Sequence, residues 1–82
     1  MYYLRYIGRF NRQRLEAMGL NARQIEIMIL IVTQKRITNA GVQELTGANR
    51  KATSRDLEDL VERELIERHG QGRGTHYTAR SD

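Results

Sequence analysis

The chain has 82 residues, of which 39% are hydrophobic and 29% are charged, and its formal net charge is +4. This length allows one domain with a small core, and the absence of cysteine excludes disulfides, cysteine-ligated zinc and thiol nucleophiles. The basic balance indicates an anionic partner, either nucleic acid or a membrane surface.

Metal binding and membrane insertion have little support in the sequence. His69 and His76 are the only histidines, and their Gly-rich region has no nearby carboxylate pair, so it makes a poor metal site. The longest apolar run, residues 27–32, is far shorter than the roughly 20 residues that cross a bilayer. Arginines interrupt the N-terminal apolar residues, so no secretory signal is predicted. We expect a cytoplasmic protein that needs no cofactor and contacts no membrane.

Residues 2–18 have apolar side chains at spacings compatible with an amphipathic helix, with arginines between them. We treat residues 1–19 as a linker or dimerisation segment that precedes a domain at residues 20–80. Its arginines could contact phosphates. The commoner arrangement is a helix that packs on this domain or on a partner, with its arginines in water.

A helix is predicted over residues 22–34. Asn21 followed by Gln24 approximates a capping box. The predicted apolar stripe is Ile25, Met28, Ile29 and Val32, and the other side carries Ile27, Leu30 and Ile31. A helix that is apolar nearly all round is buried on more than one face. One face can meet the core, and the other can meet residues 2–18, a second copy or a missing domain; a ligand pocket is a rarer alternative. We expect a homodimer through residues 2–34.

The next segment predicts two helices joined by a tight turn. Ile37 and Thr38 form at most a stub of strand. Asn39 can cap a second helix at about residues 40–46, whose Val42 and Leu45 face inward. Gly47 then supplies the left-handed residue that ends this helix. Two helices joined by a short Gly-containing turn are typical of a helix-turn-helix.

The third helix, at about residues 50–63, is the centre of the predicted site. Asn49 can cap it, and the core stripe is Thr53, Leu57, Leu60 and Val61. The outward or lateral positions are then Arg50, Lys51, Ser54 and Arg55. Cations in the first turns of a helix oppose its dipole, so these turns are suited to an anionic partner. We interpret residues 49–63 as a recognition helix in a DNA major groove. Alternatively, the cations are adventitious, and Arg55 pairs with Asp59 at i+4.

Two strand-like runs, residues 65–69 and 75–78, surround the Gly-rich residues 70–74 and predict a β-hairpin. No helix follows the glycines, which excludes a P-loop and a dinucleotide fingerprint. Arg73 at the tip, with Arg68 and His69 below it, would place cations beside a phosphate backbone or in a minor groove. A helix-turn-helix followed by a hairpin is a winged helix. Residues 70–74 form the part of its wing that we expect to contact the phosphate backbone of DNA.

Residues from about 20 to 78 resemble the C-terminal winged-helix domain of two groups of bacterial and archaeal proteins. These are the RecG-related ATP-binding transcriptional regulators and the Fic family. The most specific elements are Arg55-Asp56-Leu57 and Gly72-Arg73-Gly74-Thr75-His76-Tyr77. The resemblance implies a DNA-binding, transcription-regulating module. It transfers no enzymatic residues, because the His-Pro-Phe signature of Fic proteins cannot occur in a chain without proline.

Three positions depart from the pattern of these families. Gly41 replaces an acidic residue and weakens the second helix, and Glu64 replaces the glycine that usually closes the third helix. Ala52 and Thr53 stand in reversed order, which turns a hydroxyl toward the core.

These observations predict a mainly α fold with a small β-hairpin, a winged helix-turn-helix with an extra N-terminal helix, and no enzyme. The expected DNA-binding residues are Asn39, Asn49, Arg50, Lys51, Ser54, Arg55, Arg68 and Arg73. The alternative is a protein-interaction or regulatory module of a larger Fic-type or ATP-binding enzyme whose catalytic domain is missing here. The acidic stretch at residues 56–67, which would repel DNA, favours this alternative.

Overall fold

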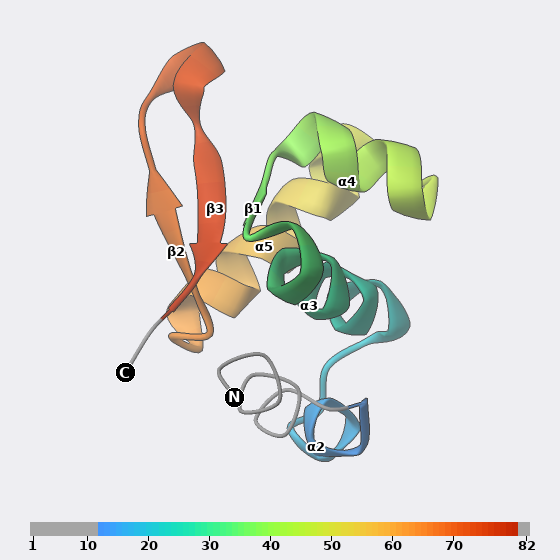
Figure 1. Ribbon diagram of the computed structural model, residues 1–82. Coiled ribbons are helices and arrows are strands. Elements are labelled where there is room, and N and C mark those ends of the chain that lie inside the picture. The colour runs from blue at the N-terminus through green and yellow to red at the C-terminus, as the bar shows by residue number, and fades with distance from the viewer. Residues whose placement is uncertain (1–11, 81–82) are drawn as a thin grey trace.

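The computed structural model describes residues 12–80, and its helices lie to one side of a three-stranded antiparallel sheet (Figure 1). Its elements are α2 (Arg12–Ala17), α3 (Ala22–Gln34), β1 (Arg36–Ile37), α4 (Asn39–Thr46), α5 (Arg50–Glu62), β2 (Ile66–His69), the 3-10 turn η1 (Gly72–Gly74) and β3 (His76–Ala79). The predicted winged helix-turn-helix, mainly helical with a β-hairpin, is confirmed.

Helix α3 begins at the predicted capping box. The Asn21 Oδ1 accepts from the Gln24 backbone N–H at 2.8 Å, and the Gln24 Oε1 accepts from the Asn21 N–H at 3.0 Å. Both sides of this helix contribute to the core, as predicted, because Ile25, Ile27, Met28 and Ile31 are buried. Ile29 of the predicted stripe is instead 40% exposed. Gln24 is also buried, and its Nε2 donates to the Asp56 carbonyl oxygen and to the Asp59 Oδ2 of α5.

Helix α4 starts one residue earlier than predicted, and Asn39 does not cap it. The Thr38 Oγ1 accepts from the Gly41 N–H at 3.1 Å and is the cap, which makes Asn39 the first helical residue. The prediction that Leu45 faces inward was also wrong: Leu45 is 51% exposed, whereas Val42 is buried. Two turns of helix bury only one residue against the core, and Leu45 lies outside that line of contact. Gly47 ends the helix with φ +75°, as predicted.

Helix α5 has the predicted cap and core stripe. The Asn49 side chain accepts from the Ala52 N–H at 2.8 Å. Thr53, Leu57 and Leu60 are fully buried, so the reversed order of Ala52 and Thr53 does place a hydroxyl in the core. After the helix, Glu64 adopts φ +62° in the left-handed region, where a glycine would be unstrained.

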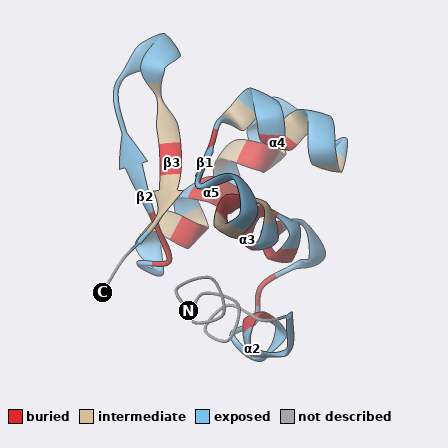
Figure 2. Cartoon of the chain, viewed as in Figure 1, coloured by how far each residue is buried: buried red, intermediate tan, exposed pale blue. Residues whose placement is uncertain are grey.

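The core lies where α3, α5 and the sheet meet, as Figure 2 shows. Leu15 of α2 is fully buried in the same core. The helix predicted for residues 2–18 is described only from Arg12 onward, and the rest lies outside the described residues. The division into residues 1–19 and 20–80 stays a prediction.

The wing is the hairpin of β2 and β3, residues 66–79. Its register pairs Arg68 with Tyr77, and the predicted strand stub is real, because Ile37 of β1 pairs with Tyr77 on the other edge of β3. Gly70 is required at the wing tip: its φ is +78°, and a Cβ there would lie 2.4 Å from the Gly74 carbonyl oxygen.

Candidate nucleic-acid interface

A groove separates the wing from helices α4 and α5, with a volume of about 600 Å³. We call it the wing groove. Its lining is Thr38, Asn39, Ala40, Gln43, Arg50, Ser54, Arg68, Gly72, Arg73, Thr75 and Tyr77. Five of the eight predicted DNA-binding residues are among these: Asn39, Arg50, Ser54, Arg68 and Arg73. Three separate stretches of sequence thus meet at one surface feature.

Three arginines of different origin line the wing groove. Arg50 is the first residue of α5, and Arg73 lies in η1 at the wing tip. Arg68 points inward because side chains alternate along β2 and its ladder partner, Tyr77, lies on the inner face of the sheet. All three are exposed, and none forms a salt bridge within residues 12–80. Their charge is therefore available to an anion in the groove.

The wall opposite the wing contains a short chain of hydrogen bonds. The Asn39 Nδ2 donates to the Ser54 Oγ at 3.0 Å, and the Gln43 Nε2 donates to the Asn39 Oδ1. These bonds join α4 to α5. The sequence analysis did not identify Gln43, although its i+4 spacing from Asn39 on one helix was a usable signal.

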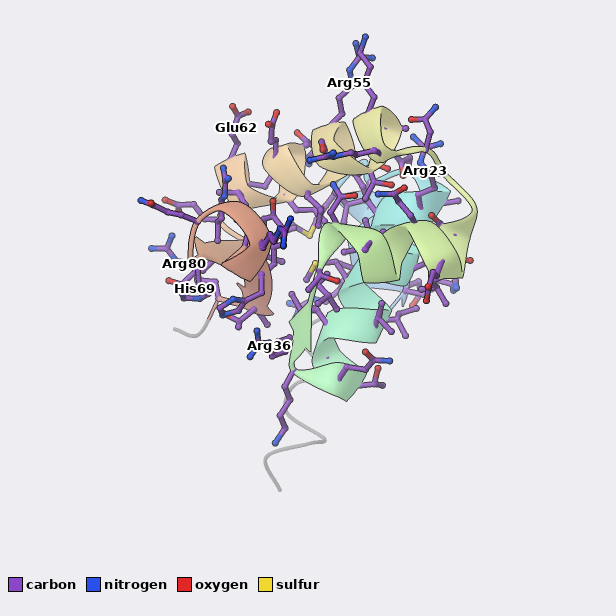
Figure 3. The ribbon with its side chains drawn as sticks, turned by 90° about the horizontal axis from the view of Figure 1, so that it is seen from above. Arg23, Arg36, Arg55, Glu62, His69 and Arg80 are labelled. Carbon is purple, nitrogen blue, oxygen red and sulfur yellow. The ribbon has the colours of Figure 1, made fainter. Side chains whose placement is uncertain are left out.

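Lys51 and Arg55 lie outside the wing groove, on the exposed outer face of α5. Figure 3 shows Arg55 projecting away from the rest of the chain. The suggested pairing of Arg55 with Asp59 was wrong, because the Asp59 Oδ2 accepts from the Gln24 Nε2 at 2.7 Å and the Arg63 Nε at 2.9 Å. Asn49 is exposed and acts as the helix cap.

The charge on the outer face of α5 changes from positive to negative along the helix. Lys51 and Arg55 lie in the first two turns, and the exposed Glu58 and Glu62 follow in the last two. Figure 3 shows Arg55 and Glu62 well apart along the helix. An anionic partner is therefore attracted to the N-terminal half of α5 and repelled by the C-terminal half.

Asp56 differs from the other acids of α5 because it is buried, at 5% exposure. Its Oδ2 accepts from the Arg23 Nε at 2.7 Å, and its Oδ1 accepts from the Asn21 Nδ2 at 3.0 Å. The interpretation of residues 56–67 as one acidic surface was wrong at this position. The hydrogen bond that Arg23 donates to Asp56, and then the negative charge of Asp56, raise the pKa of Arg23 above its ordinary value.

Asp59 continues this polar contact between α3 and α5. The hydrogen bond from Gln24, and then the hydrogen bond from Arg63, lower the pKa of Asp59 below its ordinary value. The Arg63 Nη1 also donates to the Met18 carbonyl oxygen at 2.7 Å. The rear of α5 is thus bonded to the segment that leads from α2 into α3.

The outer face of the wing carries the two histidines. The rings of His69 and His76 stack with centroids 5.2 Å apart, and the His69 Nε2 lies 2.9 Å from the Thr78 Oγ1. The expectation that His69 faces the same partner as Arg68 was wrong, because neighbouring side chains of a strand point to opposite faces and His69 lies outside the wing groove. Among residues 12–80, no group of three His, Asp or Glu side chains is arranged to hold a metal ion.

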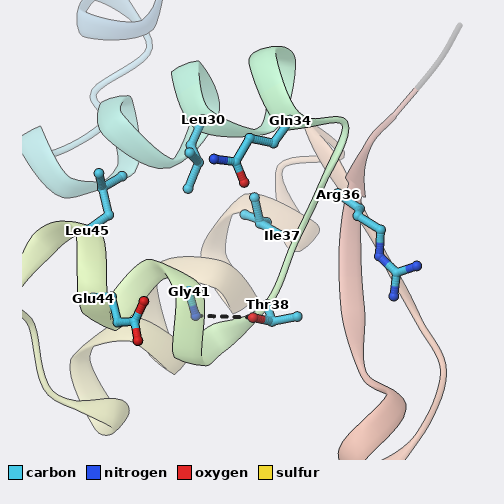
Figure 4. Close-up of a pocket in the computed structure, with 8 residues that line it drawn as sticks. All are labelled: Leu30, Gln34, Arg36, Ile37, Thr38, Gly41, Glu44 and Leu45. Atoms are coloured by element: carbon cyan, nitrogen blue, oxygen red, sulfur yellow. Dashed lines mark hydrogen bonds between the residues drawn. The ribbon is translucent and has the colours of Figure 1, made fainter.

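A second pocket, of about 400 Å³, lies between α3 and α4 (Figure 4). Its apolar lining comes from Leu30, Ile37 and Leu45, with Gln34 and Glu44 as polar members. This pocket contains none of the predicted DNA-binding residues. Within the described part of the chain, no helix is long and apolar enough to cross a membrane.

No family model and no curated protein matches the sequence. Among solved structures, the chain is similar to the reduced form of MarR from E. coli, with a TM-score of 0.69 and 20% identity over 95% of this chain and 60% of MarR. The oxidised form of MarR gives a TM-score of 0.67 and 19% identity over 95% and 57%. The chain therefore spans about 60% of the MarR chain. At these identities the likeness establishes the winged-helix fold and gives no support to a RecG-related or Fic-type parent.

Proposed function

We propose that this chain binds double-stranded DNA as a transcription-regulating module, with α5 in the major groove and the wing on the phosphate backbone. The observation that carries the proposal is the set of five exposed cations around the N-terminal half of α5, none of them in a salt bridge within residues 12–80. They are Arg50, Lys51, Arg55, Arg68 and Arg73. MarR is itself a winged-helix transcription regulator, which supports the same function here.

The cations fall into two groups with different expected partners. Lys51 and Arg55 project from the outer face of α5 and would reach base edges, where Arg and Lys bind guanine O6 and N7. Arg68 and Arg73 line the wing groove from the wing, and Arg50 lines it from α5, so a phosphate strand in the groove would meet cations from both sides. Phosphate contacts of this kind release counterions, so the affinity would fall steeply with salt.

We also propose that the chain forms a homodimer through residues 2–34. Met18 and Ile29 are 42% and 40% exposed and lie in this range. Two copies would double the phosphate contacts and would read two half-sites related by two-fold symmetry. Residues 1–19 would serve as the dimerisation segment, and access to chromosomal DNA requires a cytoplasmic chain.

The second candidate is a protein-interaction module, the regulatory winged helix of a larger Fic-type or ATP-binding enzyme with a catalytic domain outside this chain. The exposed Glu58 and Glu62 in the second half of α5 favour it, as do the apolar side chains of Leu30 and Leu45, which line the second pocket and not the wing groove. Such contacts would depend little on salt.

The deciding experiment is a titration of the chain against random double-stranded DNA at roughly 50 and 200 mM salt, with sedimentation at the same concentrations. The proposal expects affinity to fall by orders of magnitude between these salts. Sedimentation shows whether two copies bind. No binding at low salt would contradict the proposal and favour the interaction module.

A further inference from the structure

The Ser54 hydroxyl occupies a defined place in the wall of the wing groove. Its oxygen accepts a hydrogen bond from the Asn39 Nδ2 at 3.0 Å. A serine hydroxyl has one hydrogen and two lone pairs, so this bond uses a lone pair and leaves the hydrogen for another partner. Among the described residues, no acceptor takes that hydrogen, although the side chain is half-buried. The groove contains the space for the missing acceptor.

A second hydrogen bond, from Gln43 to Asn39, sets the direction of the bond between Asn39 and Ser54. An amide presents NH₂ to one side and oxygen to the other. The Asn39 oxygen is engaged by the Gln43 Nε2, so its NH₂ group is turned toward Ser54. Gln43 donates to Asn39, Asn39 donates to Ser54, and Ser54 is left to donate into the groove. Every bond in the chain has the same direction.

We infer that Ser54 reads a base by donating this hydrogen to a major-groove acceptor, with Asn39 and Gln43 as positioning residues. The inference rests on the proposed function. The acceptors available in the major groove are guanine N7 and O6, adenine N7 and thymine O4, whereas cytosine presents only its N4 amino donor. The strand position that faces Ser54 is therefore selected against cytosine.

A base fits this hydroxyl better than a phosphate does. Ser54 is short and lies on α5 itself, one turn after Arg50, so its partner must come against the surface of the helix. Base edges do so when a helix occupies the major groove. Arg68 and Arg73 reach into the same groove from the wing and supply the charge that a phosphate requires.

The first test selects binding sites from a randomised duplex pool with the full chain and with Ser54→Ala and Ser54→Thr. We expect the unmodified chain to disfavour cytosine at one position by about three- to tenfold, the effect of one neutral hydrogen bond. Ser54→Ala loses this preference at that position alone, and Ser54→Thr, which keeps the hydroxyl, retains it. Circular dichroism and thermal melting confirm that each variant is folded.

The second test reverses the hydrogen-bond direction. In Asn39→Asp, the carboxylate accepts the Ser54 hydrogen, so the Ser54 oxygen presents lone pairs and favours the amino groups of cytosine or adenine. In Gln43→Glu, the new carboxylate draws the Asn39 NH₂ toward itself, which turns the Asn39 oxygen to Ser54 with the same result. Ala40→Glu adds the same charge to the groove lining without entering the chain of bonds. It therefore lowers affinity for all sequences equally.

The outcomes separate this inference from the function on which it rests. A shift of the preference toward cytosine or adenine in both Asn39→Asp and Gln43→Glu, absent in Ala40→Glu, supports it. If Ser54→Ala weakens all sequences equally, Ser54 contacts phosphate and the inference is wrong while DNA binding stands. DNA binding without any base preference would likewise contradict the inference about Ser54 and leave the proposed DNA binding in place. No binding at any salt overturns the proposed function and the inference with it.

Discussion

Arg23 of α3 and Asp56 of α5 form an ion pair, with 2.7 Å between the Arg23 Nε and the Asp56 Oδ2. The Asp56 side chain is 7% exposed and that of Arg23 is 46% exposed. The pair fixes the rear of the proposed recognition helix to the start of α3. The apolar pattern of the sequence contains no sign of this ion pair.

Replacing Asp56 with Ala is expected to destabilise the fold by about 2 kcal/mol, because it removes charged hydrogen bonds from Arg23 and Asn21. Arg23→Ala is expected to cost less, since Asn21 still bonds to the carboxylate and water reaches the site. Urea unfolding of both variants measures these losses, with Arg36→Ala as a control for removal of an exposed arginine. Equal stability of Asp56→Ala and the unmodified chain would contradict the prediction.

Replacing Thr53 with Val is expected to stabilise the fold by about 1 kcal/mol. The Thr53 side chain is fully buried, and its Oγ1 has no hydrogen-bond partner among residues 12–80. An unsatisfied buried hydroxyl costs about 1–3 kcal/mol, and valine fills nearly the same space without it. The urea midpoint should rise with an unchanged m-value. A lower midpoint would show that the hydroxyl has a partner, such as a buried water.

Replacing Glu64 with Gly is expected to stabilise the fold by roughly 0.5–1 kcal/mol. Glu64 has φ +62°, a conformation that strains a residue with a Cβ and that glycine adopts freely. Its contact with Arg80, at 3.7 Å between exposed groups, adds little. Glu58→Gly, which makes the same change at an exposed position in the interior of α5, should instead destabilise by about 1 kcal/mol. The two thermal melts should therefore shift in opposite directions.

Asp59 is expected to make stability fall in acid. Its pKa is lowered in the folded chain, so the unfolded chain binds the proton more readily, and the stabilising effect is fully present at neutral pH. This contribution is lost as the pH falls below about 4, through the lowered pKa of the folded state. Unfolding midpoints between pH 7 and pH 3 would show it. Asp59→Asn should weaken this pH dependence while keeping a group that Gln24 and Arg63 can contact. An unchanged dependence would contradict the assignment.

Combined replacement of Arg50, Lys51 and Arg55 with Ala is expected to abolish DNA binding and leave the fold intact. The three side chains are exposed, and no salt bridge holds them within residues 12–80. The control removes the same number of charges away from the site, with Arg12, Arg36 and Arg80 replaced by Ala. Figure 3 shows Arg36 and Arg80 away from Arg55. Unchanged binding by the first variant, or equal loss in both, would contradict the assignment of the recognition helix.

Local signals in the sequence were sufficient for most of the fold. The capping box at Asn21 and Gln24, the left-handed residue Gly47 and the glycines of the wing each act on their own neighbours, so helix limits and the hairpin could be predicted. The stripe of α5 was correct because three of its members meet one core. The expectation that glycine suits position 64 came from the family resemblance and not from a local signal.

The errors arose where contacts distant in sequence decide the outcome. The burial of Gln24 depends on its bonds to α5, and the burial of Asp56 depends on Arg23, which is 33 residues away. Neither contact produces a periodic pattern. Asn39 has the composition of a cap, yet Thr38 takes that role and frees the Asn39 side chain for Ser54. The convergence of α4, α5 and the wing on one groove likewise required the tertiary structure.

The pairing of Ile37 with Tyr77 has a consequence for the speed of recognition. It bonds the segment between α3 and α4 to the central strand of the sheet, so the wing cannot move away from the helices without breaking backbone hydrogen bonds. The groove is then already formed in the free chain. Little conformational entropy is lost when a ligand enters a preformed surface, and association needs no slow rearrangement. We therefore expect complexes of this chain to form at a rate set by electrostatic attraction, and to differ from one another chiefly in lifetime.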